Sequence, residues 1–372
     1  MNQNLSHFPI NYDYARKQFL SGLSNRSDWQ IGKWRIPSAV DVDLFVDHAY
    51  LAPLKSFEKL FVIVSGVHGL EAYAGSAVQR LFLNEILPTI KLNHIGVFLV
   101  HCMNPYGFKY HRRCTENEVN LNRNCSSKLD LYKTKNSESL NLCDQYIPKK
   151  PVDSLTSTLI NKIQNQQILI DNFIKTVGLG QFESEKGLEF GGFGPEPQVR
   201  ALTERLKELM PSYKDVILLD LHTGLGEKNC LHLLGDDSPG SIDPSLCNEL
   251  FDPARDHKIY QFTPSHSEGF YPTFGTLNSL FPELALKSQR ICALTMEFAT
   301  LGHSPDNQVD GLNRWMLEHQ GNHYGYVSPD LEHKIRSMYL EKFFPATNEW
   351  KNNVLNLSRQ LLQTVMSRSQ AL

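Results

Sequence analysis

Runs of apolar residues divide this chain, and each run gives way to a polar or glycine-containing turn. The clearest runs cover residues 60–64, 95–102, 216–221 and 291–300. They are rich in β-branched and aromatic residues and too short to cross a membrane, which is typical of strands buried on both faces. Segments with helical spacing lie between and after them. The pattern predicts an α/β protein built on an open sheet.

The flanking segments predict further elements. A short amphipathic helix is expected around Phe19, and the alternation in Ile31–Ile36 and Val40–Val46 predicts half-buried strands at the edge of the sheet. The motif N-P-Y-G at Asn104–Gly107 predicts a turn after the second run. Helices are expected at residues 152–177, 197–210, around 315–317, at 331–344, and along a final apolar stripe of Trp350, Val354, Leu357, Leu361 and Val365.

The first apolar run ends at Ser65-Gly66 and is followed by His68 and Glu71. A helix of small residues begins directly after them. Ligands bind in open α/β sheets at the carboxyl ends of strands, and a histidine and a carboxylate three residues apart can face one metal ion there. The motif H-x-x-E also occurs by chance in solvated turns, so a metal site needs a third ligand elsewhere in the chain.

The third run supplies a candidate for that ligand, because it also ends in a histidine and a glycine turn, at His222-Thr223-Gly224. If the two strands are neighbours, His68, Glu71 and His222 converge. Two histidines and a glutamate are the ligand set of a catalytic zinc site that leaves one position for water. Asp220 is either a partner that orients the imidazole of His222 or a plain strand-end carboxylate.

The fourth run contains a carboxylate, Glu297, among apolar residues. A buried glutamate needs a partner, a nearby cation or a raised pKa. Glu297 is therefore the best general-base candidate in the chain. In contrast, His101 inside the second run is expected to be a core histidine with a satisfied hydrogen bond.

A polar segment without regular period covers residues 111–124. Its arginines and asparagine, namely Arg112, Arg113, Asn122 and Arg123, suit an anion clamp, because a guanidinium matches a carboxylate with two hydrogen bonds. The alternative is a solvated loop whose arginines pair with Glu116 and Glu118. Composition by itself favours the loop.

Residues 125–200 are rich in Asn, Ser and Lys and are predicted to be an insertion that shapes or covers a pocket, without a core of its own. A second segment, Ser267–Pro272, is predicted to be a mobile loop. Its Tyr271 is a candidate to donate a hydrogen bond to substrate, with a packing role as the alternative.

Composition excludes several classes of protein. The 372 residues carry a formal net charge of −3 and no basic stripe, so no nucleic-acid footprint is expected. The seven cysteines are scattered without C-x-x-C, which suggests neither a zinc ribbon nor a disulfide framework. The amino terminus has no apolar core of signal-peptide type. A soluble protein of a reducing compartment, the cytoplasm, without membrane partners, is expected.

Taken together, the motifs resemble those of the zinc carboxypeptidase family, the carboxypeptidase A-like metallopeptidases. The resemblance covers roughly residues 60–300 and rests on motifs in the family's order: H-x-x-E (His68, Glu71), N-P-Y-G, L-N-R-N (Leu121–Asn124), D-L-H-T-G (Asp220–Gly224) and a strand glutamate. The wording V-S-G-V-H-G-L-E-A-Y-A-G-S-A is similar to a largely uncharacterised bacterial branch of that family. The same ligand pattern also serves aspartoacylases and related amide deacylases.

This resemblance implies a three-layer α/β/α fold with a mixed, mostly parallel sheet, as a single domain over residues 1–372 with a C-terminal helical segment at 311–372. It also implies one Zn²⁺ ion and a role for each matching residue. These roles are zinc ligation by His68, Glu71 and His222, the general base Glu297, carboxylate binding by Asn122 and Arg123, oxyanion stabilisation by Arg113 with Arg112 as rival, and substrate binding by Tyr271.

The predicted function is hydrolysis of an amide bond next to a free carboxylate, by water that zinc activates, with a small peptide as substrate. An N-acyl amino acid is the alternative substrate, as in aspartoacylase-type deacylases. A non-catalytic protein that binds zinc and peptide is a further alternative. An α/β serine hydrolase is disfavoured, because the chain contains no G-x-S-x-G elbow.

Overall fold

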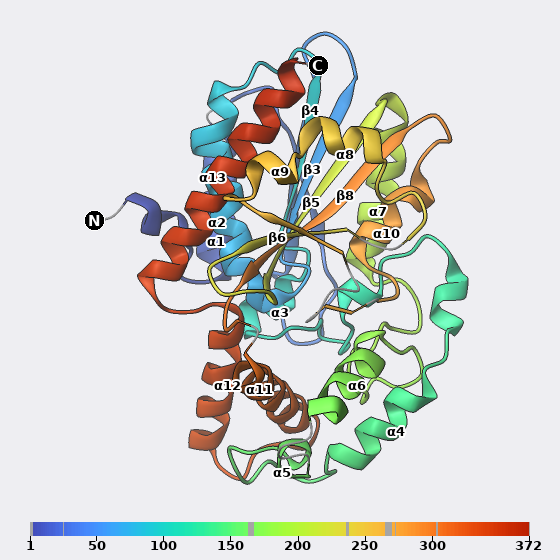
Figure 1. The fold of residues 1–372 in the computed structure, drawn as a ribbon, viewed down its shortest axis with the longest axis vertical. Coiled ribbons are helices and arrows are strands. Elements are labelled where there is room, and N and C mark those ends of the chain that lie inside the picture. The colour runs from blue at the N-terminus through green and yellow to red at the C-terminus, as the bar shows by residue number, and fades with distance from the viewer. Residues whose placement is uncertain are drawn as a thin grey trace.

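A twisted sheet of eight strands, in the order β1-β2-β4-β3-β5-β8-β6-β7, forms the centre of the computed structural model (Figure 1). The structure describes residues 3–24, 26–162, 167–235, 238–264, 270–271, 273–302 and 304–371. The strands are β1 (Gln30–Arg35), β2 (Phe45–Leu51), β3 (Lys59–Ser65), β4 (Ile95–His101), β5 (Asp215–Gly224), β6 (Leu231–Gly235), β7 (Gln261–Thr263) and β8 (Arg290–Ala299).

The four predicted apolar runs form the four central strands, β4, β3, β5 and β8, which are parallel to one another. On the outer sides, β2 pairs antiparallel with β4 and β6 pairs antiparallel with β8. The chain moves from β3 to β4 on one side and to β5 on the other, so the strand order reverses beside β3. Such a reversal is where open α/β sheets bind ligands.

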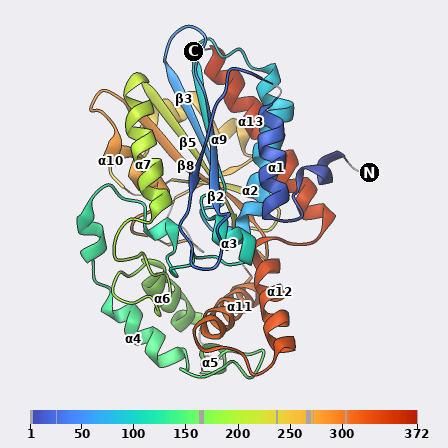
Figure 2. The same ribbon diagram turned by 180° about the vertical axis from the view of Figure 1, so that it is seen from behind.

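Helices cover both faces of the sheet, which confirms the expected α/β/α layers (Figures 1 and 2). One apolar cluster packs the first face against α1 (Tyr12–Leu23), α2 (Ala72–Leu81), α8 (Pro244–Leu250) and α13 (Asn348–Ala371). A second cluster packs the other face against α7 (Pro197–Leu209) and α10 (Leu277–Leu284). In α7 the predicted apolar face is buried, as it is in α13 at Trp350, Val354, Leu361 and Val365.

A group of helices lies beyond one end of the sheet, at the bottom of Figure 1. It comprises α4 (Ser137–Tyr146), α5 (Thr158–Lys162), α6 (Gln167–Gly178), α11 (Pro305–Tyr324) and α12 (Pro329–Phe343). Cys143 and Phe173 of the insertion share an apolar cluster with Leu312 and Met316 of α11. The insertion therefore completes its core with the C-terminal helices. None of the described helices is long and apolar enough to cross a membrane.

Three local predictions are wrong. The predicted strand at Val40–Val46 begins only at Phe45, and Val40 and Val42 lie exposed in the loop before it. Asn104 caps a short helix, α3 (Pro105–Tyr110), by accepting from the Gly107 N–H, because Asn followed by Pro begins a helix as readily as a turn.

The third concerns the helix expected at residues 152–177. It begins only at Thr158, because Val152 pairs with Tyr326 in an isolated bridge. Residues 163–166 of that expected helix lie outside the described part of the chain. The short helix α9 (Pro253–Asp256) follows α8 and was not expected.

Candidate metal centre

The turn after β3 brings His68 and Glu71 to the carboxyl edge of the sheet. Gly66 has a φ of +67°, a left-handed conformation that suits glycine at this sharp exit from the strand. Gly69 packs directly on the backbone of Gly107, where a Cβ would lie 2.0 Å from the Gly107 carbonyl carbon. This close approach fixes the 3₁₀ turn Gly69–Glu71, from which Glu71 points back toward β5.

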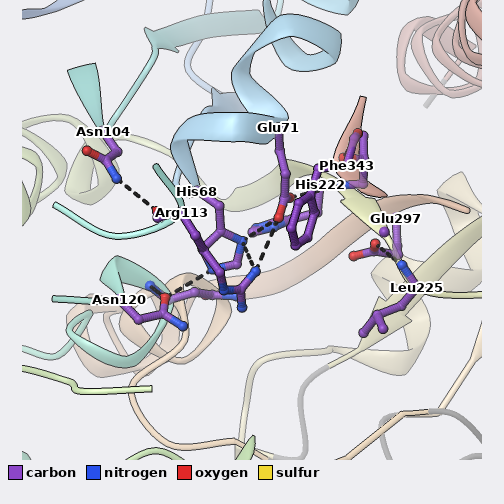
Figure 3. A network of polar contacts seen from close by, with 12 residues as sticks. His68, Glu71, Asn104, Arg113, Asn120, His222, Leu225, Glu297 and Phe343 are labelled. Carbon is purple, nitrogen blue, oxygen red and sulfur yellow. Dashed lines mark hydrogen bonds and ion pairs between the residues drawn. The ribbon is translucent and has the colours of Figure 1, made fainter. Parts of the chain in front are cut away.

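The strands β3 and β5 are neighbours, which meets the condition for convergence, and their ends bring His68, Glu71 and His222 together (Figure 3). One ligand atom from each lies within 4.8 Å of the other two. Glu71 lies between the two rings, with Oε1 2.8 Å from His68 Nδ1 and Oε2 2.9 Å from His222 Nδ1. All three side chains are buried. The geometry offers two imidazole nitrogens and a carboxylate to one point.

The outer nitrogens of both rings have their own partners. His68 Nε2 lies 3.0 Å from Asn120 Oδ1, and His222 Nε2 lies 2.7 Å from Asp220 Oδ2. Each Nε2–H donates to an oxygen, so each Nδ1 is directed at Glu71. Histidine ligands of metals are held in this way, by a hydrogen bond on the other ring nitrogen.

The carboxylates of Glu71 and Asp220 make the candidate centre favourable for a cation. Burial and Arg113 lower the pKa of His68 to about 4, so this ring is neutral and its Nδ1, with the proton on Nε2, carries a lone pair. Burial opposes the charge of His222, but Asp220 and Glu71 outweigh it and raise its pKa well above the usual value. His222 thus lies between two carboxylates that need a proton or a metal ion beside Nδ1. A divalent ion fits this donor set, and a His₂Glu set suits zinc.

Glu297 lies on β8 beside the three candidate ligands, where its Oε1 accepts from the Leu225 N–H at 2.8 Å (Figure 3). Its side chain is 5% exposed. Burial, and then the charge of Glu71, raise its pKa to about 8. A carboxyl whose pKa is close to neutrality is suited to taking and giving a proton.

Arg113 reaches the centre as well. Its Nη1 lies 3.2 Å from His68 Nδ1 and 3.4 Å from Glu71 Oε1. Arg112 turns the other way and pairs with Glu118 and Glu318, 3.1 and 2.9 Å away. Of the two rival arginines, the structure brings only Arg113 to the candidate centre.

Glu189, a residue that the sequence patterns did not single out, is the counter-ion of this region. Its Oε1 lies 3.3 Å from Arg113 Nε, and its Oε2 lies 2.9 Å from Arg123 Nη2 and accepts from Asn120 Nδ2. Its backbone φ is +52°, an uncommon conformation for a residue other than glycine. The only available signal was its place in the glycine-rich stretch 187–194. Asn120, also missed, stands two residues before the predicted Asn122.

Asn122 and Arg123, the predicted carboxylate-binding pair, already make hydrogen bonds within the protein. Arg123 donates from Nε to the Gly178 carbonyl and from Nη1 to the Asn122 carbonyl, in addition to its pair with Glu189. The side chain of Asn122 accepts from the Leu277 N–H at the start of α10. Tyr271 packs its ring on Gly178, and burial raises the pKa of its hydroxyl. The other residues of its predicted loop, apart from Phe270, lie outside the described part.

A cavity of about 680 Å³ adjoins the centre. Its lining includes the three candidate ligands, Glu297, Arg113, Asn122, Arg123 and Tyr271, together with residues of α6, α11 and α12. Arg112 does not line it. The insertion contributes Ile174 and Lys175 of α6 to the lining of the cavity.

The fold and the site define an α/β protein with a candidate His₂Glu metal centre at the carboxyl edge of its sheet. The chain belongs to the family described as "Protein of unknown function (DUF2817)", whose sequence profile matches residues 8–357. None of the curated proteins matches it.

Solved structures similar to the chain include metallo-carboxypeptidases and thrombin activatable fibrinolysis inhibitor. Thrombin activatable fibrinolysis inhibitor is 14% identical, with 96% of this chain and 74% of that one covered and a TM-score of 0.49. The metallo-carboxypeptidase of Burkholderia cenocepacia is 10% identical, with 98% and 71% covered and a TM-score of 0.48. That of Pseudomonas aeruginosa, in complex with (2-guanidinoethylmercapto)succinic acid, is 13% identical, with 98% and 70% covered and a TM-score of 0.48.

Proposed function

We propose that this protein is a zinc-dependent hydrolase that cleaves an amide bond next to a free carboxylate. The observation that carries the proposal is the convergence of His68 Nδ1, Glu71 and His222 Nδ1 beside Glu297, at the wall of a cavity. A zinc ion held by these three side chains would supply a Lewis acid that polarises a carbonyl and lowers the pKa of water to about 7.

Glu297 is the proposed general base. Its carboxylate takes a proton from the attacking water and then gives it to the leaving amine. The Leu225 N–H holds Oε1 at 2.8 Å, which fixes the orientation of the carboxyl group. Glu71 lies between the two imidazoles, whereas Glu297 lies beside them as a buried carboxyl group. Burial raises the pKa of Glu297 to about 8, and a cation held by the three candidate ligands would lower this pKa and favour the carboxylate form that the base needs.

Arg113 is the proposed donor to the oxygen of the scissile carbonyl. Its Nη1 faces the same point as the two Nδ1 atoms, and Glu189 holds its Nε from the other side. Contacts of this type stabilise a transition state by about 3–4 kcal/mol. The carboxylate of the substrate is assigned to a cationic residue of the cavity lining, which includes Arg123 and Lys342.

The test is metal analysis followed by substrate comparison. Protein purified without chelator is expected to contain one zinc ion per chain, and removal of zinc is expected to abolish hydrolysis until zinc is restored. Dipeptides with a free C-terminus and N-acetyl amino acids are compared side by side, because an aspartoacylase-like deacylase would prefer the second. Zinc binding without hydrolysis of either set would leave a non-catalytic zinc protein and refute the proposal.

A further inference from the structure

Arg113 and Arg123 are poorly placed to bind a substrate carboxylate, because both already pair with a carboxylate of the protein, that of Glu189. Glu189 lies between Arg113 and Arg123, and all three nitrogens of the Arg123 guanidinium group have partners within the chain. Burial opposes the charge of Glu189, yet the two arginines lower its pKa to about 2, so it is ionised at neutral pH. A second carboxylate at this place would have to displace the first.

Lys342 is a cation of the same cavity that has no such counter-ion. Its Nζ lies 5.0 Å from the ring centroid of Phe343 and 6.0 Å from that of Trp315. Aromatic rings attract an ammonium without neutralising its charge. Within the described part of the chain, Lys342 makes no ion pair or hydrogen bond. Burial, and then Arg113, lower its pKa to about 8, while the charges of Glu189 and Glu71 act in the opposite direction, so Lys342 is still mostly protonated at pH 7.

The C-terminal end of α12 makes a hydrogen bond with the strand that carries His222, and Lys342 lies at this end of α12. Thr223, the residue after His222, donates from its hydroxyl to the Phe343 carbonyl at 2.6 Å. The ring of Phe343 lies 5.8 Å from the guanidinium carbon of Arg113 (Figure 3). Lys342 is therefore one residue from the contact that joins α12 to the strand of His222, and it lines the cavity from that side.

We propose that Lys342, and not the Asn122–Arg123 pair, binds the free carboxylate of the substrate. The inference takes from the proposed function that the substrate carries a free carboxylate. Binding of a carboxylate by Lys342 does not itself depend on turnover. It predicts ligands with one group directed at the metal and a carboxylate directed at α12. A dicarboxylate is the simplest molecule of this kind.

The test measures binding of succinate, glutarate and adipate to the zinc-loaded protein by isothermal titration calorimetry, with butyrate as the monocarboxylate reference. The best dicarboxylate is expected to bind more tightly than butyrate. Lys342→Met is expected to weaken it by about 10- to 100-fold, as for loss of a hydrogen bond to a charged group, and to leave butyrate unchanged.

Two lysines provide matched controls. Lys351 lies over Phe8 and Phe344, away from the cavity, and Lys175 is an exposed lysine that lines it from α6. Lys351→Met and Lys175→Met are expected to bind the dicarboxylate as the unchanged protein does. Equal binding by Lys342→Met, loss of binding in Lys175→Met instead, or no preference for dicarboxylates would each overturn the inference. Failure of the proposed hydrolase activity would show separately, as absence of amide cleavage despite intact dicarboxylate binding.

Discussion

His222 on β5 and Glu297 on β8 are paired in the register of these parallel strands, so a candidate metal ligand and a buried carboxylate lie side by side on neighbouring strands. The backbone of the sheet fixes their separation, and the Leu225 N–H orients the carboxyl group. Residues on a sheet hold their geometry better than residues on loops. This pair therefore gives the most direct tests of the proposed chemistry.

Glu297→Gln is expected to keep zinc and to lower turnover by about 100- to 10,000-fold, because the amide cannot take a proton. Zinc content and amide hydrolysis are measured on the same preparation. Glu318→Gln is the matched control, since Glu318 is also buried with a raised pKa but lies outside the cavity lining. Near-normal turnover of zinc-loaded Glu297→Gln would remove Glu297 from the role of base.

His68→Ala is expected to lose zinc, with an affinity loss greater than the roughly 10- to 100-fold typical of an outer partner. It should also lose stabilisation by zinc, which amounts to about 2.7 kcal/mol at a zinc concentration 100 times the Kd. Thermal unfolding with and without zinc measures this. His101→Ala is the control, because His101 is a buried histidine at the end of β4 that bonds Ser76, as expected of a core histidine. A zinc response in His68→Ala equal to that of the unchanged protein would contradict the ligand assignment.

Substitutions of the adjacent residues Arg113 and Arg112 are expected to have different effects, on catalysis and on stability respectively. Arg113→Gln is expected to lower kcat by about 100- to 1,000-fold, since it removes a donor to the developing oxyanion. Arg112→Gln should leave kcat near that of the unchanged protein and lower only stability, because it leaves Glu318 buried without its guanidinium. Steady-state kinetics and urea unfolding of both variants test the difference. A larger loss of kcat in Arg112→Gln would reverse the assignment.

Glu189→Gln is expected to lower the free energy of unfolding at pH 7 by about 3 kcal/mol, from the shift of the Glu189 pKa from 4.5 to about 2. A lowered carboxyl pKa stabilises the folded state above the unfolded-state pKa. The difference between the two proteins should therefore shrink as the pH falls from near 4.5 toward 2. Urea unfolding at pH 7 and pH 3 measures it.

Glu58→Gln is the control for that experiment. Glu58 pairs with Lys214 in a solvated position, and such pairs contribute little, about 0–1 kcal/mol. A difference for Glu189→Gln that stays constant over this pH range would show that its charge is not the stabilising feature.

Much of the fold was predictable because the sheet is buried on both faces. Strands of this kind appear as continuous apolar runs, and β3, β4, β5 and β8 all lie where those runs do. The exposed edge strand β1 lies where the alternation predicted it, whereas β6 and β7 at the other edge were not predicted and β2 starts later than predicted. The apolar alternation that begins at Val40 continues through an exposed loop before the strand starts.

The candidate ligands followed from two strands that end in histidine turns, once the strands were taken as neighbours. The sequence could not identify Glu189, because its importance comes from a contact with Arg113 and Arg123, which are far from it along the chain. It also could not choose between Arg112 and Arg113. Adjacent side chains on an irregular loop point in directions that only the fold determines.

By itself the sequence determined the class of fold and the residue types of the candidate centre, since local apolar runs and turn motifs record burial and strand ends. Only the tertiary structure decided which charges neutralise one another. Lys342 shows why: it lies on a helix for which the sequence predicted no chemistry, and it reaches the cavity because α12 packs against the end of β5. Electrostatic pairing depends on distances through space, which a linear pattern does not contain.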